Sequence, residues 1–515
     1  MPLGPAGCLA FKAVPARNML SNFFQLGDYI ILKPEILLSI FGLAILLLDL
    51  FLDDAHKYWN AILALAGLAF AIIQVGLFWE AAMAHPGFLP YAAFDGRFTL
   101  DFFAIYLQLV ILAATAIVIL ISVRYLEIEK AHHGEYYALL LLAAVGMMAL
   151  AAGTDLIVLF IALELMALSE YVLTGFLRRS RRSNEAAVKF LLLGAFSSGL
   201  LLYGMSLLYG IAGSTKLSVI SARLAERPAD DPLSWIAMIT LLAGLYFKIA
   251  AVPFHQWTPD AYEGAPTSIT AFLSVGPKVA SFALFLRLMI GCLWPLRQEW
   301  QALTIGVAIA TLTLGNLAAI TQTNVKRFFG YSTISHVGYL LLGVVAVGSG
   351  PSGRQGLTAI LIYLLVYAFM NLGAFAVVVM LRRKNIIGDE MNDFAGLMSR
   401  APLPAVLMVI FLLSLAGIPP TAGFIGKYYI FLSLIETRHY ALAVLGVAYA
   451  VVALYYYFRI VALMFMKEAQ DTVPLASGPG LRLALAVTLG LTLFIGIYPE
   501  PFIALAQQAM RPFFS

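Results

Sequence analysis

Charged residues and cysteines are scarce in this sequence. Only 12% of its 515 residues are charged, whereas a typical soluble domain has about 25%. This scarcity excludes an ordinary soluble globular protein. The two cysteines, Cys8 and Cys292, are far apart and belong to no CxxC or Cys/His cluster. The sequence therefore gives no sign of a zinc site, an iron–sulfur cluster or a disulfide framework.

Signals for nucleotide or nucleic-acid binding are also missing. The sequence has no GxxxxGK[ST] motif and no strand-linked GxGxxG, so we expect no nucleotide, redox cofactor or metal on this chain. The net charge of +4 does not indicate a nucleic-acid partner, which would need a basic face on a soluble surface. The first 29 residues lack the basic start and continuous apolar core of a cleaved signal peptide, and they do not distinguish Met1 from Met19 as the start.

Apolar residues are abundant, at 62% of the chain. They form successive runs of roughly 20 residues, about the length of a helix that crosses a hydrocarbon core some 30 Å thick. We therefore predict an all-α integral membrane protein that contacts the lipid bilayer. Fourteen transmembrane helices are expected, near residues 30–52, 58–80, 99–123, 135–153, 154–176, 185–211, 234–258, 266–290, 301–322, 329–348, 356–381, 402–436, 440–466 and 480–500.

Nearly the whole chain is predicted to form one membrane bundle, since no segment is long enough for a separate soluble domain. Loops rich in Lys and Arg stay cytoplasmic, which places RRSRR at 178–182 and RRK at 382–384 inside and the N-terminus outside. The expected units are a weakly ordered leader at 1–29, helices 1–3 at 30–134, a first five-helix unit at 135–290, a second at 301–466, and helix 14 with a C-terminal tail at 480–515.

Six ionisable residues are predicted to lie within the apolar runs. A charged side chain at the centre of a membrane helix costs about 2.5–3.5 kcal/mol unless it pairs or lines a hydrated cavity. A desolvated lysine beside a movable carboxylate can take up or release a proton near neutral pH, so these residues indicate proton transfer. They are Glu164 in span 5, Lys189 in span 6, Lys248 and His255 in span 7, Lys278 in span 8, and Lys427 in span 12.

Structural roles stay open for three of these residues. Lys189 lies near the start of its predicted helix and can extend to the cytoplasmic surface. His255 can be a neutral histidine that bonds to backbone groups freed by Pro253. Glu164 can neutralise one lysine and hold the bundle together, and this role is compatible with a functional one.

Prolines are predicted to break two of the helices. Pro253 interrupts span 7 shortly after Lys248, and Pro419 and Pro420 interrupt span 12 shortly before Lys427. Irregular backbone at membrane depth is tolerated only where it is buried in protein or lines water, and transporters often place such breaks in corresponding halves of an internal repeat. Spans 4–8 and 9–13 are therefore predicted to be two inverted five-helix repeats, with the fourth helix of each one broken.

Several separated motifs resemble the antiporter-like membrane subunits of respiratory complex I, most closely the N type. They are RSNEAAVKFLLLGAFSSG, FKIAAVPFHQWTPDAYEGAPTSITAFLSVGPKVASF, YSTISHVGY and LAGIPPTAGFIGKYY, and the resemblance covers roughly residues 30–500. The M type has a glutamate at the position of Lys427. The L type continues into a long extension with a lateral helix, whereas this sequence ends at Ser515, soon after span 14.

The resemblance implies a proton pathway through this chain. It matches Glu164, Lys189, Lys248, Lys278 and Lys427 to the family's functional positions, with His255 in the segment beyond the span 7 break. Glu164 is then expected to modulate Lys189 and Lys248. Protons are expected to enter from the cytoplasm, pass near His255 and Lys278, and leave through Lys427. An additional acid at position 170 has no role in this scheme.

The resemblance also implies partners and a location. NADH, FMN, iron–sulfur clusters and quinone are expected on other subunits, and the neighbours are expected to be the M-type subunit and small membrane subunits in a bacterial plasma (inner) membrane. A subunit of a multi-subunit Na⁺/H⁺ antiporter is the alternative, because it would share the fold and most of the lysines. A purely scaffolding subunit would explain the helices but not the deep lysines. The electron donor, quinone type and proton count stay open.

Overall fold

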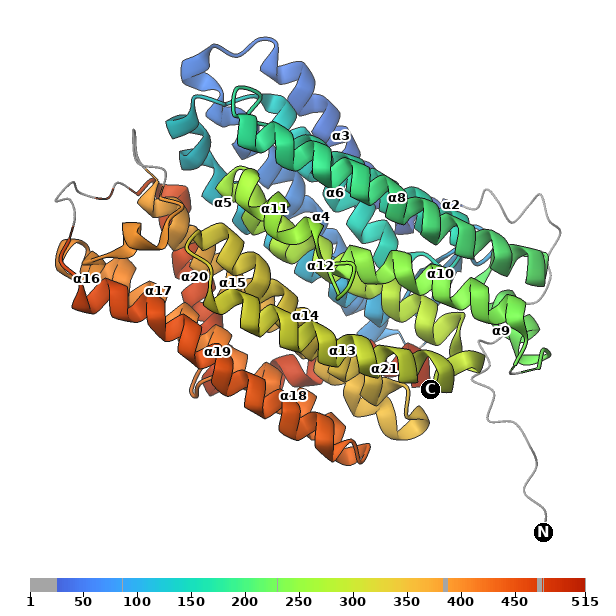
Figure 1. The fold of residues 1–515 in the computed structure, drawn as a ribbon. Helices are drawn as coiled ribbons and strands as arrows, with labels where there is room; N and C mark the ends of the chain where they lie inside the picture. The colour runs from blue at the N-terminus through green and yellow to red at the C-terminus, as the bar shows by residue number, and fades with distance from the viewer. Residues whose placement is uncertain are drawn as a thin grey trace.

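The computed structural model describes residues 26–85, 87–228, 230–382, 388–469, 475 and 477–514. Most of the predicted leader lies outside the described residues, and positions 26–29 belong to a short helix, α2 (Leu26–Ile31). The described chain is a bundle of long helices that run in broadly similar directions (Figure 1). This arrangement satisfies the backbone polar groups within each helix, as a hydrocarbon environment requires.

The first part of the bundle consists of six long helices and one small hairpin. β1 (Tyr91–Ala93) pairs antiparallel with β2 (Phe98–Leu100) in the loop before α5. The Asp101 side chain accepts a hydrogen bond from the Ala104 amide and so caps the N-terminus of α5. The helices are α3 (Lys33–Asp49), α4 (Tyr58–Ala84), α5 (Phe102–Glu129), α6 (Gly134–Ala152), α7 (Leu156–Thr174) and α8 (Arg181–Ala212).

The second part of the chain contains both interrupted helices. The segment around Pro253 separates α10 (Pro232–Ile249) from α11 (Trp257–Gly264), and the segment with Pro419 and Pro420 separates α17 (Pro402–Ala416) from α18 (Ala422–Glu436). Both predicted breaks are therefore confirmed. The other helices are α9 (Leu217–Ala225), α12 (Thr267–Gly291), α13 (Arg297–Ile320), α14 (Val325–Val347), α15 (Arg354–Leu381), α16 (Leu397–Arg400), α19 (Tyr440–Met466), α20 (Pro479–Ile497) and α21 (Glu500–Phe514).

Length and composition confirm an all-α membrane protein. Twelve helices of the described chain are long and apolar enough to cross a membrane, and each corresponds to one of the predicted runs. Of the two remaining runs, one contains α3, which has 17 residues, and the other is divided into α17 and α18. The count of fourteen spans and the two inverted repeats stay predictions.

The core of the bundle lies around α12, α14 and α15. The apolar window of α12 is 100% buried, and those of α14 and α15 are each 94% buried. By contrast, α8 and α19 lie on opposite flanks in Figure 1 and expose large apolar side chains such as Phe196 and Val444. Exposed apolar flanks around a core with buried polar groups fit a protein whose surroundings are lipid.

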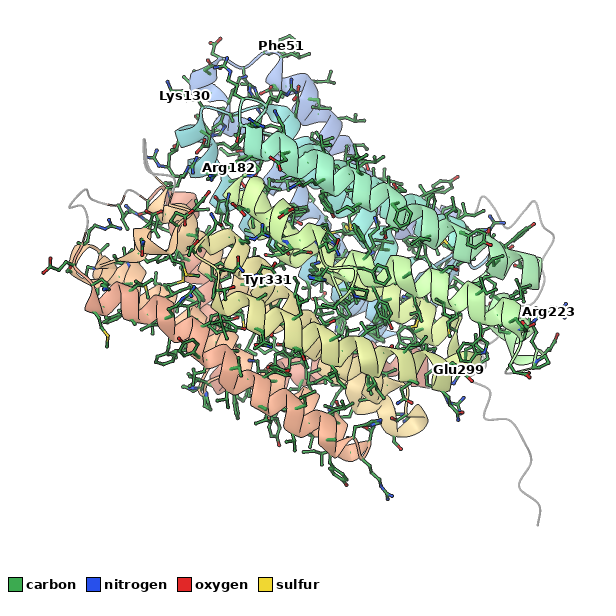
Figure 2. The ribbon with its side chains drawn as sticks, in the orientation of Figure 1. Phe51, Lys130, Arg182, Arg223, Glu299 and Tyr331 are labelled. Carbon is green, nitrogen blue, oxygen red and sulfur yellow. The ribbon has the colours of Figure 1, made fainter. Side chains whose placement is uncertain are left out.

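Charged side chains mark the two ends of the bundle. Lys130 and Arg182, both in predicted cytoplasmic loops, lie at one end in Figure 2, whereas Arg223 and Glu299 lie at the other. The loops that contain Lys130 and Arg182 thus lie at the same end, whereas positions 383–384 of the predicted RRK segment lie outside the described residues. The hairpin, the short helix α9 and the helix α21, which packs against α5 and α15, have no counterpart in the predicted set of helices.

Candidate functional site

Lys248 lies in the last turn of α10, directly before the first break. Its side chain is buried, with 8% of its surface exposed. It interacts electrostatically with two carboxylates of the neighbouring helix α7, Glu164 and Glu170. Glu164 is partly buried and accepts a hydrogen bond from the Ser198 hydroxyl of α8, at 2.5 Å. Glu164 and Lys248 are therefore within electrostatic range of each other, although no ion pair within 4.0 Å joins them in the described part of the chain.

The backbone of the first break finds partners despite the proline. Ala250 adopts the left-handed conformation (φ 66°), and the amides of Ala250 and Ala251 donate to carbonyls of the last turn of α10. The indole of Trp257 donates to the Phe247 carbonyl at 2.9 Å, and the Val252 amide donates to the Thr311 hydroxyl at 3.0 Å. Side chains therefore replace hydrogen bonds that the helix loses.

His255 lies inside this break and is half-buried. Its carbonyl accepts a hydrogen bond from the Thr258 amide as α11 begins. Nδ1 of its ring is buried and has no hydrogen-bond partner among the residues that the structure describes. The ring also has a backbone interaction at Pro253, so the structural role and the role in proton exchange both stay predictions for this residue.

Lys278 lies in α12, directly after Pro277 within the helix. Its side chain is 1% exposed, and Nζ has no hydrogen-bond partner in the described part of the chain. Nζ lies 4.5 Å from the centre of the Trp257 ring, as in a cation–π contact. Its carboxylate partner is Glu170, with which it interacts electrostatically.

Lys189 occupies a different place from the other predicted lysines. It lies near the start of α8, and about half of its side chain is exposed. Nζ pairs with Glu185 at 2.9 Å and with Asp260 of α11 at 3.2 Å. Asp260 also pairs with Arg327 of α14 at 2.6 Å. Lys189 is therefore part of a charged cluster at the end of the bundle where α8 and α14 begin, rather than being paired with Glu164.

Lys427 lies in α18, beyond the second break, and its side chain is 4% exposed. Nζ donates to the carbonyls of Leu415 and Ala416, at 3.1 and 2.7 Å, and lies 4.8 Å from the centre of the Tyr339 ring. These carbonyls belong to the last turn of α17, where the helix dipole favours a positive charge. The break itself therefore provides the site that holds the lysine.

His336 of α14 is a buried titratable residue that sequence reasoning missed. Nδ1 of its ring lies 2.7 Å from the Tyr363 hydroxyl, and Nε2 lies 3.1 Å from the Tyr457 hydroxyl. It also interacts electrostatically with Lys427. The sequence signal for this residue is a histidine inside the motif YSTISHVGY. No proline or acidic residue accompanies it, so the pattern that indicates the other sites is missing here.

Pairs of buried polar side chains lie in the core between the two broken helices. The Asn371 amide of α15 donates to the Ser274 hydroxyl of α12 at 2.7 Å, about one helical turn before Lys278. One turn along α15, the Tyr367 hydroxyl lies 2.9 Å from that of Thr333 in α14. The polar contacts then continue through His336 and Tyr363 toward Lys427. Hydroxyl and imidazole groups in such a series can pass protons, whereas the Asn371 amide only positions the Ser274 hydroxyl.

The described residues contain no group of three or more His, Cys, Asp or Glu side chains arranged to hold a metal ion. Lysine, carboxylate, imidazole and hydroxyl groups supply proton donors and acceptors. The arrangement therefore supports proton transfer between two buried centres, one at each helix break.

Comparisons with known proteins identify close relatives. Residues 153–453 match a family model described as NADH:quinone oxidoreductase/Mrp antiporter, TM. The chain is 54% identical to NADH-quinone oxidoreductase subunit N 1 of Koribacter versatilis, over 95% of this chain and 97% of that protein. It is 30% identical to a chain of respiratory complex I from Thermus thermophilus with bound aureothin, with a TM-score of 0.76 over 92% of this chain and 99% of that one.

An antiporter complex has the same fold at lower similarity. A chain of the Mrp complex from Dietzia sp. is 23% identical, with a TM-score of 0.74, over 93% of this chain and 98% of that one. At this identity the likeness shows the fold alone.

Proposed function

The chain belongs to the subunit N family of NADH-quinone oxidoreductase, the respiratory complex I, and from this premise we propose how it moves protons. It is a multi-pass, proton-translocating membrane subunit of that oxidoreductase, and the cofactors of the complex are carried by other subunits. The predicted antiporter alternative is less well supported, because the Mrp chain shares only the fold.

We propose that protons pass through the two buried centres and the polar chain between them. They enter from the cytoplasm at the end of the bundle that contains Lys189 and Asp260, pass His255 and Lys248, and reach Lys278. From there they cross the core through α14 and α15 and leave outward through Lys427. The observation that carries the proposal is that each broken helix has a buried lysine beside it, and that pairs of buried polar side chains lie in the core between the two breaks.

The carboxylates of α7 would control when the first lysine releases its proton. Two unit charges about 6 Å apart at an effective dielectric constant near 20 attract by roughly 3 kcal/mol. Weakening the Glu164–Lys248 contact by a movement of α7 or α8 would therefore favour the neutral amine of Lys248 about 100-fold. A conformational change driven by quinone reduction elsewhere in the complex is enough to trigger this step.

The setting of this subunit follows from the same proposal. NADH would be oxidised and quinone reduced on other subunits that carry FMN and iron–sulfur clusters. This chain would lie in a bacterial plasma (inner) membrane beside the M-type subunit and small membrane subunits. Neighbours on both sides are compatible with the large apolar flanks that α8 and α19 expose.

Replacing Lys248 by Met tests the proposed function. Lys248→Met removes the titratable charge and keeps a similar volume, so the complex should assemble. We expect proton pumping and NADH-driven quinone reduction to fall together, by about tenfold or more, when both are measured in the same membrane vesicles. Lys57→Met is the matched control, because Lys57 pairs with Asp49 and Asp54 away from the breaks, and it should behave as the wild type.

Two other results would overturn the proposal. Full pumping in an assembled Lys248→Met complex would remove this lysine from the pathway. Normal pumping and quinone reduction with a loss of Na⁺/H⁺ exchange would instead favour the antiporter alternative.

A further inference from the structure

Glu170 is a buried carboxylate that the sequence left without a role. It lies on α7, its side chain is 4% exposed, and its Oε1 atom has no hydrogen-bond partner within the described ranges. A buried carboxylate oxygen without a donor is costly. Such a group needs a compensating charge close by.

The geometry of α7 directs its two carboxylates to different neighbours. Glu170 is six positions beyond Glu164 along α7. At 3.6 residues per turn, the two side chains are therefore about 120° apart around the helix axis. Glu164 accepts its hydrogen bond from α8. Glu170 instead faces the interior and interacts electrostatically with Lys248 of α10 and Lys278 of α12. α7 packs against both α8 and α12.

Lys278 depends on Glu170 for its counter-charge. Its Nζ atom has no hydrogen-bond acceptor in the described part of the chain and contacts the Trp257 ring. Its electrostatic partner is Glu170, whereas Lys248 interacts with both Glu164 and Glu170. Tyr171 and Tyr262 also interact electrostatically with Glu170.

Counting charges shows what Glu170 adds. With Glu164 alone, two buried lysines would share one carboxylate, and one cation would stay uncompensated. A buried charge without a partner is strongly unfavourable. With Glu170 the cluster has two acids and two lysines and can be neutral. Of the two acids in this cluster, Glu170 is the one that interacts electrostatically with both Lys248 and Lys278.

We propose that Glu170 is a relay acid that passes protons from Lys248 to Lys278, an inference that rests on the proposed function. No ion pair within 4.0 Å joins Glu170 to either lysine in the described part of the chain, so each transfer requires a side-chain movement that brings donor and acceptor within hydrogen-bond distance. The Glu170 carboxylate then accepts a proton from the Lys248 ammonium, which breaks one N–H bond, forms one O–H bond and leaves a neutral amine. The carboxylic acid then donates this proton to the neutral amine of Lys278. Lys278 becomes an ammonium and the Glu170 carboxylate is restored, so one proton has moved and no other group has changed.

The test compares Glu170→Gln with Glu170→Asp in the whole complex. The amide is nearly isosteric but carries neither the charge nor the proton, so we expect pumping and quinone reduction to fall at least about tenfold. The shorter acid keeps the titratable group with poorer placement, so Glu170→Asp should retain more activity than Glu170→Gln. Ser169→Ala is the control, because within the described residues the hydroxyl of this buried neighbour on α7 bonds only to the Leu165 carbonyl. Assembly is checked on native gels.

The pH profile separates a relay from a packing role. Without the carboxylate the protonated amines of Lys248 and Lys278 are less favoured, so the alkaline limb of the activity profile should move to lower pH by about one unit in Glu170→Gln. Glu170→Asp should keep the wild-type limb. Wild-type activity and profile in Glu170→Gln would overturn the proposal, and so would equal losses in both variants with an unchanged profile.

Failure of this inference is distinguishable from failure of the proposed function. If Lys248→Met is inactive and Glu170→Gln is normal, only the relay is wrong. If Lys248→Met is normal, the proposed pathway is wrong. Should Glu170→Gln not assemble, Glu170→Asp decides: slowed pumping supports the relay, and wild-type pumping contradicts it.

Discussion

At the scale of single residues, the two principal lysines are stabilised in different ways. Lys248 has two carboxylates of α7 as its electrostatic partners. Lys427 has carbonyls at the end of a broken helix and an aromatic ring. The first lysine therefore responds to a change in charge, whereas the second responds to a change in backbone geometry. This difference is compatible with a first site, at Lys248, where a change in charge triggers proton transfer, and a second site, at Lys427, that releases protons outward.

His336 gives a prediction at the same scale. Its ring bridges two tyrosine hydroxyls from α15 and α19. Gln in its place retains a donor and an acceptor but cannot be protonated, so His336→Gln should keep the fold and slow pumping by about tenfold or more. The rate of proton uptake into vesicles per assembled complex measures this effect.

Thr313→Val is the matched control for His336. The Thr313 hydroxyl lies 2.7 Å from that of Tyr449 in α19, so it also forms a contact between helices, but at a partly buried position away from the lysines. Pumping at the wild-type rate in His336→Gln would exclude this histidine from the pathway. An equal loss in both variants would indicate damage to packing.

At the scale of elements, a residue with positive φ ends the first helix segment at each break. Ala250 (φ 66°) follows α10, and Gly417 (φ 90°) follows α17. A residue in this conformation stops the helix and turns its last carbonyls toward other donors. At the second break this donor is Lys427, so the C-terminus of α17 and the lysine form one unit.

Gly417→Ala tests that unit. A Cβ atom at this position would lie 2.7 Å from Cδ of Lys427, and an L residue in this conformation costs roughly 1–2 kcal/mol. We expect the lysine to be displaced from its carbonyls, pumping to fall severalfold, and the thermal inactivation temperature of the complex to drop.

Gly213→Ala is the control that separates backbone strain from displacement of the Lys427 side chain. Gly213 ends α8 with φ 65°, and a Cβ atom there would meet nothing within 4 Å. The backbone strain is similar, but no lysine is touched, so pumping should stay near the wild-type rate. If both variants lost pumping equally, the placement of Lys427 by the break would not explain its role.

The elements that were not predicted have physical explanations. The sequence EPFIALAQQAMRPFF follows the last predicted span and falls in the predicted C-terminal tail, whereas the structure forms the helix α21 there. In the structure Phe513 of α21 is buried and packs edge-on against Phe103, beside the buried Arg287–Asp101 ion pair. Only the tertiary contact explains this helix, because an isolated helix of this length is marginal in water.

At the scale of the whole molecule, the sequence predicted the bundle better than the site. Long apolar runs and prolines indicate spans and breaks directly, because bilayer thickness and the missing proline amide fix them. Contacts between helices depend on rotation and register, which apolar sequence does not encode. Three features depend on such packing: the exposed position of Lys189 beside Asp260, the burial of Glu170 within electrostatic range of two lysines, and the hydrogen bond between Ser274 and Asn371.

The central claim is that protons cross the whole bundle by titrating its buried lysines, and Lys427→Arg tests it most directly. Arginine can still donate to the α17 carbonyls, but it does not lose its proton. The control is Lys326→Arg, because Lys326 is equally buried and bonds to the Ala265 carbonyl and to Asp389.

The measurement is proton pumping with NADH-driven quinone reduction in the same vesicles. We predict that Lys427→Arg assembles normally and loses both activities by about tenfold or more, while Lys326→Arg retains both. Wild-type pumping in Lys427→Arg would contradict the account, because a permanently charged group would then be sufficient at this position.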